Sequence, residues 1–285
     1  MNSHDTQSVH EQGYEHFRDA QYFRDKYEAR KNNLTQRAER IRSEILPAKR
    51  EQAAARASQY RTKYGHEPAR GQFEGTVVSY EHALDTIEQQ LEFLRPSSEE
   101  DMQYRLHVMN DLPAAIQDAT PDGLPLRFHG THIYHARSIL QSQGASSSVD
   151  RLGIATSYDT ADQVSVTAPD TFETTINGYS GLLEEEGCVP AGCVFVMLPS
   201  SQEEAKAGDS MLMNNVNFKE QPERLFAIMT SDENVPNVRE WAAAAGVGEQ
   251  KVVEFFEFPS RLDAVRRDIE AGHVTLQQYV PYQLS

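Results

Sequence analysis

The stretch ATPDGLPLRFHGT (119–131) divides the chain into two parts of different character. Its first nine residues are rich in Pro and Gly, which favours a linker, and LRFHGT (126–131) predicts a short strand that ends in a turn. Apolar residues follow helical spacing before this stretch, whereas short apolar strands and helices alternate after it. We therefore expect an α+β fold, with a helical module at 1–118 and a mixed α/β domain at 119–285.

The amino-terminal part predicts helices throughout. Apolar residues at near-helical spacing indicate a helix over 11–45, which we expect Pro47 to end. The Ala-rich and Arg-rich run 48–64 predicts a second helix, and an apolar stripe predicts a third over 76–94. Ser98 is a suitable cap for a fourth. This module contains no catalytic constellation, so we expect it to bind a partner or to act as a scaffold.

The carboxy-terminal part predicts strands separated by helices. GCVFVMLP (192–199), RLFAIM (224–229) and KVVEFFEF (251–258) have few polar interruptions and read as strands. VREWAAAAG (238–246) and SRLDAVRRDIEAG (260–272) read as helices that end at a glycine.

Charge and composition limit the partners. The formal net charge is −16, and residues 101–285 hold 12 basic against 26 acidic residues. Such an acidic surface repels phosphate backbones, so we do not expect nucleic acid as a partner. No run approaches the roughly 20 apolar residues that span a bilayer. The first twelve residues are polar and lack the apolar core of a signal peptide, so we do not expect one. Cys188 and Cys193 fit reduced thiols, and no cluster of metal ligands is evident; the oligomeric state stays open.

The first candidate site segment is RFHGT (127–131). Arg127 and His129 share one face of the expected strand, Gly130 lets a ligand approach the backbone, and Thr131 adds a hydroxyl. These groups suit a diphosphate and a ribose. Taken alone, the segment fits equally well a buried histidine and a surface arginine at an ordinary strand end.

Two later segments complete the candidate set. In GIATSYD (153–159), clustered hydroxyls and an aromatic ring could form a wall for a sugar and a flat ring, although a plain Ser/Thr turn explains them as well. In NFKEQPE (217–223), Glu223 stands at the mouth of an expected buried strand, with Glu220 and Gln221 just before it. A solvated acidic loop is the alternative for this segment.

In their order, the three segments resemble the ADP-ribosyltransferase family. In that family a first strand offers Arg or His, a second carries a Ser-Thr-Ser-type or Tyr-bearing segment, and a later strand opens with a catalytic Glu. FHGT followed by a helix is similar to the poly-ADP-ribose polymerase branch, and Ala155-Thr156-Ser157 is similar to the Arg-Ser-Glu toxin branch. Ala155 departs from the leading Ser of that pattern, which leaves the part played by Ser157 open.

A helical module joined to such a domain resembles bacterial effector mono-ADP-ribosyltransferases, among them enzymes that modify a threonine of ubiquitin. The resemblance implies a split central β-sheet and NAD as co-substrate. It also implies a host protein such as ubiquitin as acceptor, and a secreted effector without a signal peptide that acts in the host cytosol. No metal is implied.

The resemblance also implies residue roles. Glu223 would bind the ribose 2′-hydroxyl and stabilise the oxocarbenium-like sugar, while Ser157 would position that ribose. Glu220 would deprotonate an acceptor hydroxyl and Gln221 would orient it. The residues implied to contact NAD are Arg127, His129, Gly130, Thr131, Thr156, Tyr158 and Tyr179.

Two alternatives stay open. The domain could hydrolyse NAD instead of transferring ADP-ribose, or the chain could be a helical binding protein whose transferase-like domain is degenerate and inactive. Ala155 is the feature that favours the second alternative.

Overall fold

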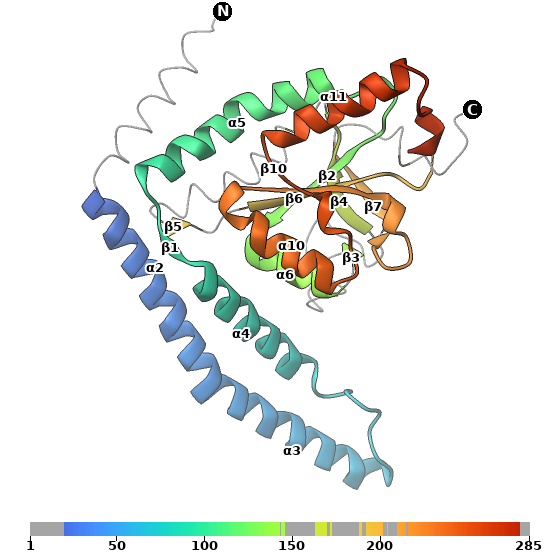
Figure 1. The fold of residues 1–285 in the computed structure, drawn as a ribbon. Helices are drawn as coiled ribbons and strands as arrows, with labels where there is room; N and C mark the ends of the chain where they lie inside the picture. The colour runs from blue at the N-terminus through green and yellow to red at the C-terminus, as the bar shows by residue number, and fades with distance from the viewer. Residues whose placement is uncertain are drawn as a thin grey trace, which may run out of the picture.

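The computed structural model describes residues 20–142, 144–145, 163–169, 172, 188–189, 192–201, 204, 210–214 and 216–279. These residues form a helical arm and a β-sheet that has helices on both faces (Figure 1). The α+β expectation therefore agrees with the structure. In the described ranges, no helix has both the length and the apolar character that a bilayer crossing requires.

The arm consists of one long bent helix and a shorter helix that runs back along it (Figure 1). The long helix comprises α2 (Ala20–Arg40), a π-helical turn at Ile41–Ile45, and α3 (Leu46–Tyr64). The predicted end at Pro47 is wrong. Proline lies in the first turn of α3, where its missing N–H is tolerated, and the preceding π-turn absorbs the change in hydrogen-bond register.

The returning helix is α4 (Gly75–Phe93), close to the predicted 76–94. It shares a small core with the long helix, formed by Leu34, Ala38, Ile41, Leu46, Val77, Ile87 and Leu94. Ion pairs Arg42–Glu88 and Arg50–Glu81 also join the two, although both pairs are solvent-exposed and add little stability. The arm is thus held mainly by its apolar seam.

Helix α5 (Glu99–Ala119) begins where the sequence predicts. The Asp101 amide donates to Ser98 Oγ at 3.1 Å, and the Ser98 amide donates to Asp101 Oδ2 at 2.7 Å. This is a reciprocal capping box. Arg95, just before the cap, binds both carboxylate oxygens of Asp101 at 2.9 Å and also reaches Glu233 at 2.5 Å. The start of α5 is therefore tied to the carboxy-terminal half of the chain.

The main sheet has six strands in the order β10-β9-β6-β2-β4-β7. They are β2 (Arg127–His132), β4 (Gln163–Thr167), β6 (Gly192–Met197), β7 (Ser210–Asn214), β9 (Leu225–Thr230) and β10 (Val252–Glu254). Among the described strands, only β9 and β10 pair in parallel. The split of the central sheet that the resemblance implies stays a prediction. Two short ladders lie beside the sheet, namely β1 (Arg95–Pro96) with β5 (Cys188–Val189) and β3 (Gly144–Ala145) with β8 (Val216–Asn217).

The strand expected over 251–258 is wrong in its second half. β10 ends at Glu254, and α11 (Glu257–Glu270) begins three residues later. The aromatic residues there face the core from a turn and a helix start: Phe255 and Phe258 are both fully buried. An apolar run can be buried in any backbone conformation, so hydrophobicity alone did not distinguish strand from helix.

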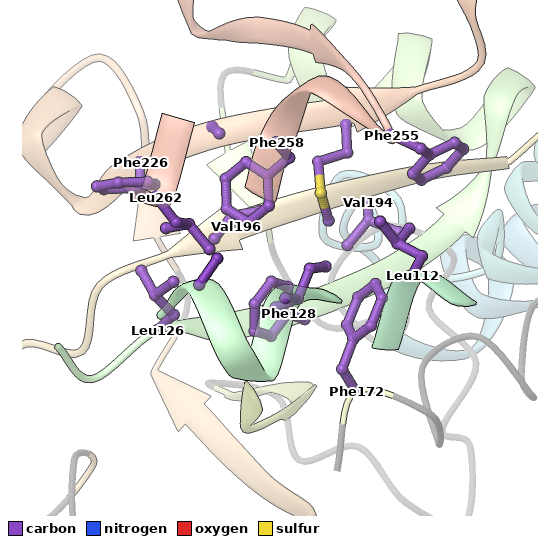
Figure 2. Packing of buried hydrophobic residues seen from close by; sticks show 14 of the residues in the cluster. Leu112, Leu126, Phe128, Phe172, Val194, Val196, Phe226, Phe255, Phe258 and Leu262 are labelled. Atoms are coloured by element: carbon purple, nitrogen blue, oxygen red, sulfur yellow. The ribbon is translucent and has the colours of Figure 1, made fainter. Parts of the chain in front are cut away.

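Two helix pairs cover the two faces of the sheet (Figure 1). On one face, α5 and α11 pack over Phe128, Val194, Val196 and Ala227 (Figure 2). On the other, α6 (Ile133–Gln141) and α10 (Val235–Ala244) pack over Cys193, Phe195 and Ile228. Residues of β6 alternate between these two cores, as the period of a strand requires.

Helix α5, which the sequence groups with the helices before it, belongs by packing to the sheet. Val108, Leu112 and Ile116 are fully buried in the same core as Phe128 and Phe258. The hydroxyl of Tyr104 donates to Glu254, and Arg266 donates to the carbonyl of Asp118 at 2.7 Å. A fragment that begins at 119 would lose one of the two helices on this face.

We predict that Leu112→Ala lowers the free energy of unfolding by about 2–5 kcal/mol, since it leaves a cavity in a fully enclosed site. Leu106 is the matched control, because it lies on the same helix but is only half-buried. Urea denaturation of both variants measures the effect. Equal costs for Leu112→Ala and Leu106→Ala would contradict the placement of α5 in the sheet core.

Candidate functional site

Arg127 lies at the first position of β2 and is only 3% exposed. Its guanidinium donates to the carbonyl of Leu126 at 2.8 Å and to the carbonyl of Glu204 at 3.0 Å. A group that is enclosed and bonded in this way is not presented to a diphosphate. The structure therefore gives Arg127 a structural role at the edge of the sheet, in place of the ligand contact that the resemblance implies.

Glu204 is the centre of a buried polar network that sequence reasoning missed. Its carboxylate accepts from Arg224 at 3.1 Å, from the Ser200 amide at 2.6 Å and from the Ser200 hydroxyl at 2.9 Å. Arg224 also donates through Nε to the carbonyl of Leu198 at 3.1 Å. The Arg224 and Glu204 side chains are 3% and 8% exposed. Buried charges persist only when they are paired and hydrogen-bonded in this way.

Burial lowers the pKa of Arg224, and the neighbouring carboxylates of Glu204 and Glu223 oppose that shift.

Together, Arg127, Glu204 and Arg224 connect the start of β2 to the start of β9. In sequence, Glu204 sits among exposed-looking polar residues, and no local pattern marks it as a buried partner.

The remaining residues of the first segment lie further along β2. His129 and Thr131 are partly buried, and Gly130 is exposed. His129 pairs with Phe195, whereas the alternate residue Phe128 pairs with Val196. Directly paired residues share a face, so His129 belongs to the α6 and α10 side and Phe128 to the α5 and α11 side.

The turn before β9 presents the predicted carboxylates to solvent. Asn217 Oδ1 accepts from the amides of Lys219 at 3.0 Å and Glu220 at 3.3 Å, and the Phe218 ring is buried against Phe195. The turn is therefore anchored at its base. Glu220 itself is exposed.

Glu223 occupies the middle of a short 3-10 turn, Pro222–Arg224, that leads directly into β9. It is exposed, while Arg224 and Leu225 on its carboxy-terminal side are buried. Gln221 accepts from Arg224 Nη1 at 3.4 Å. Glu223 therefore lies between Arg224, which is buried and bonded to the carbonyl of Leu198, and a Gln221 side chain that Arg224 also contacts.

The register of the sheet shows which predicted residues come together. β2 and β9 both pair antiparallel with β6, so their amino-terminal ends lie at the same edge. Arg127 and Leu225 both pair with Met197, which places them about 10 Å apart across two strand spacings. The starts of the first and third segments are therefore neighbours, whereas His129 lies deeper and on the side opposite the pocket described next.

Glu223 lines a pocket of about 290 Å³ on the α11 side of the sheet. Its other walls are Leu198, Leu225, Phe226, Lys251, Arg261, Val265, Gln278 and Tyr279. Lys251 and Arg261 are the functional candidates that sequence reasoning missed. Lys251 directly precedes β10 and Arg261 lies in α11, and the packing of α11 beside β9 brings both to the pocket.

Four predicted residues lie outside the described residues: Thr156, Ser157, Tyr158 and Tyr179. Within the described ranges, no group of three His, Cys, Asp or Glu side chains could hold a metal ion. Cys193 is a free thiol in the core, as expected, and burial raises its pKa.

Comparison with known proteins does not identify relatives. No protein-family description, no curated protein and no solved structure matches this chain.

A buried histidine marks the far end of β2. The ring of His132 stacks on Tyr134 with centroids 4.9 Å apart, and its Nδ1 is buried without a hydrogen-bond partner. Burial, and secondarily the positive charge of Arg30 on the arm, lowers the pKa of His132 to about 4. The hydroxyl of Tyr134 accepts from Gln90 of the arm at 3.2 Å, so the neutral ring of His132 stacks on a residue that joins the arm to the sheet.

We predict that Arg224→Met destabilises the fold by about 3–5 kcal/mol, because it leaves the Glu204 carboxylate buried without its counter-charge. Replacing both partners, as Arg224→Met with Glu204→Leu, should recover part of this loss. Chemical denaturation of the single and double variants measures the difference. A single variant within about 1 kcal/mol of the parent would mean that the pair is not buried as described.

We also predict that stability falls as the pH is lowered from about 6.5 to about 4. In this window His132 binds a proton in the unfolded state but not in the folded state, so protonation stabilises the unfolded state relative to the folded one. The full loss is on the order of 3 kcal/mol, reached near the folded pKa. His132→Phe should flatten this part of the profile, measured as the difference between the two proteins in urea unfolding at each pH. If the unfolding free energy changed with pH in the same way in both proteins, His132 would not be the source of the pH dependence.

Proposed function

We propose that this chain is an NAD-dependent mono-ADP-ribosyltransferase that modifies a protein. The observation that carries the proposal is the position of Glu223. Its carboxylate is exposed at the mouth of a fully buried strand and lines a pocket with aromatic and basic walls. A carboxylate that leads directly into a buried strand, beside a ligand-sized pocket, suits a reaction in which positive charge develops on a sugar.

The chemistry requires little beyond such a group. The bond between the ribose C1′ and the nicotinamide nitrogen breaks, and its electron pair leaves with the ring. Nicotinamide is cationic in NAD and departs neutral, so no acid is needed. The sugar becomes oxocarbenium-like, as in glycoside hydrolysis. Glu223 would stabilise that charge and hold the ribose 2′-hydroxyl, and the acceptor then bonds to C1′.

Glu220 is the second carboxylate in reach of an acceptor. It lies three residues before Glu223, exposed on the anchored turn. A hydroxyl acceptor must lose its proton as it bonds to C1′, and Glu220 would accept it. Gln221, which is bonded to Arg224, would help to orient the acceptor. We propose a threonine of ubiquitin as the acceptor. We also propose that the chain is an effector that acts in the host cytosol.

The arm is the proposed surface for that acceptor protein. It extends away from the sheet (Figure 1), and Tyr64 and Val78 on it are 52% and 42% exposed. Tyrosine is one of the side chains that most often anchor a protein interface, so Tyr64 is the anchor that we propose on the arm.

A second candidate function is a binding protein with an inactive transferase-like domain. The burial of Arg127 favours it, because the arginine implied to hold the diphosphate is bonded to carbonyl groups instead. Incubation with NAD and a host lysate separates the two functions, since only the enzyme labels a protein with ADP-ribose.

We predict that Glu223→Gln lowers the rate of transfer by about 10²–10³-fold and leaves the fold intact. The substitution keeps the size of the side chain and removes the charge that would face the oxocarbenium. Labelling of the acceptor by radioactive NAD measures the rate, and thermal unfolding checks the fold.

Glu220→Gln is the matched control, because it removes the same charge three residues away on the same turn. It should reduce transfer to a hydroxyl acceptor and spare the cleavage of NAD by water. Normal transfer by Glu223→Gln together with complete loss in Glu220→Gln would reverse the two roles. Release of nicotinamide without any labelled protein would identify an NAD hydrolase.

A further inference from the structure

Among the described residues, neither of the two cations in the Glu223 pocket forms an ion pair. Lys251 donates to the carbonyl of Pro222 at 2.5 Å and also to the carbonyl of Leu225. An ammonium has three donors, so one remains beyond these two bonds. Lys251 forms no ion pair with a carboxylate in the part of the chain that the structure describes, although Glu223 is near enough to interact electrostatically.

Arg261, on α11, is the second cation. Nη1 donates to the carbonyl of Gln250 at 3.0 Å, and the guanidinium lies over the Phe226 ring, 5.7 Å from its centroid. These contacts fix the plane of the group and use only part of its five donors. Arg261 likewise has no ion pair among the residues described in the structure. The contacts therefore hold it rigidly beside the pocket without neutralising it.

This arrangement has an energetic cost that a ligand would remove. Burial lowers the pKa of both Lys251 and Arg261. The positive charge of Arg261 lowers the pKa of Lys251 further, while Glu223 opposes that shift. The chain carries a net charge of −16, so carboxylates to neutralise them are abundant in its composition. Two partly desolvated cations that line one pocket, and that form no ion pair within the described ranges, are the pattern of an anion site.

We infer that Lys251 and Arg261 form the phosphate-binding site of this pocket, and that its ligand is a nucleotide. An arginine fork and a lysine ammonium together match the oxygens of a diphosphate. The pocket of about 290 Å³ has room beyond a phosphate group for a ring or a sugar, and Tyr279 supplies an aromatic wall.

The inference deepens the proposed function and in part rests on it. If the nucleotide is NAD, Lys251 and Arg261 hold its diphosphate, and Glu223 on the rim of the same pocket faces the ribose. The diphosphate contact then comes from the α11 side of the sheet and not from Arg127. Binding of a nucleotide by these two cations does not itself require the transfer reaction.

The test is calorimetric titration of the full chain with ADP, and with adenosine as the uncharged probe. We expect ADP to bind and adenosine to bind far more weakly. Arg261→Gln and Lys251→Met should each weaken ADP binding by about tenfold or more. Arg267→Gln is the matched control, because Arg267 is an exposed arginine on the same helix and should leave the affinity unchanged.

If thermal unfolding shows that the neutral variants are unstable, Arg261→Lys replaces them, because it keeps the positive charge. It should retain measurable ADP binding that weakens as the salt concentration rises. Two results overturn the inference: no binding of ADP by the parent chain, or equal loss in Arg261→Gln and Arg267→Gln. Binding that depends on Arg261 without transfer from NAD supports this site and contradicts the proposed function. Transfer that is unaffected by Arg261→Gln contradicts this site and leaves the proposed function standing.

Discussion

Strands β6 and β9 are buried on both faces, and the placement of the surrounding helices follows from this. All twelve residues of the two strands are buried, and the most exposed of them, Phe226, is 8% exposed. A sheet with two apolar faces must be covered twice. The helix pairs α5 with α11 and α6 with α10 meet that requirement, and this explains why α5 joins the sheet although it directly follows the arm.

The same constraint governs the polar edge of the sheet. Where β2 and β9 begin, apolar side chains give way to Arg127 and Arg224, both deeply buried. Charges in such a place are tolerated only with full hydrogen bonding. Glu204 provides it for both arginines, through its carbonyl oxygen to one and through its carboxylate to the other. The network holds the turn before β9, and Glu223 projects from that turn toward solvent.

The pocket differs from this edge in one respect. Arg224 has a carboxylate partner, whereas Lys251 and Arg261 contact carbonyl groups and a ring face, with no ion pair in the described part of the chain. Both arrangements place cations in partly dry surroundings. The first is internally neutralised and stabilises the fold, while the second leaves positive charge directed into a hollow. That contrast separates the structural arginines of this chain from the ones to which we assign a ligand.

Local periodicity and side-chain chemistry were enough to predict the α+β class, the helix cap at Ser98, and strands over 126–131, 192–199 and 224–229, which the structure contains with small shifts of their ends. It also placed Glu223 at the mouth of a buried strand, as a charged residue immediately before an apolar run.

The remaining features depend on contacts between segments that are far apart in the chain. Local patterns cannot state which distant group neutralises a charge, so Arg127 looked available until Glu204, 77 residues away, proved to bond it. They could not show that the long helix passes through Pro47, since the π-turn before it is a feature of backbone register. Nor could they bring Lys251 and Arg261 to Glu223, because that meeting results from the packing of α11 against β9 and is not written in any one segment.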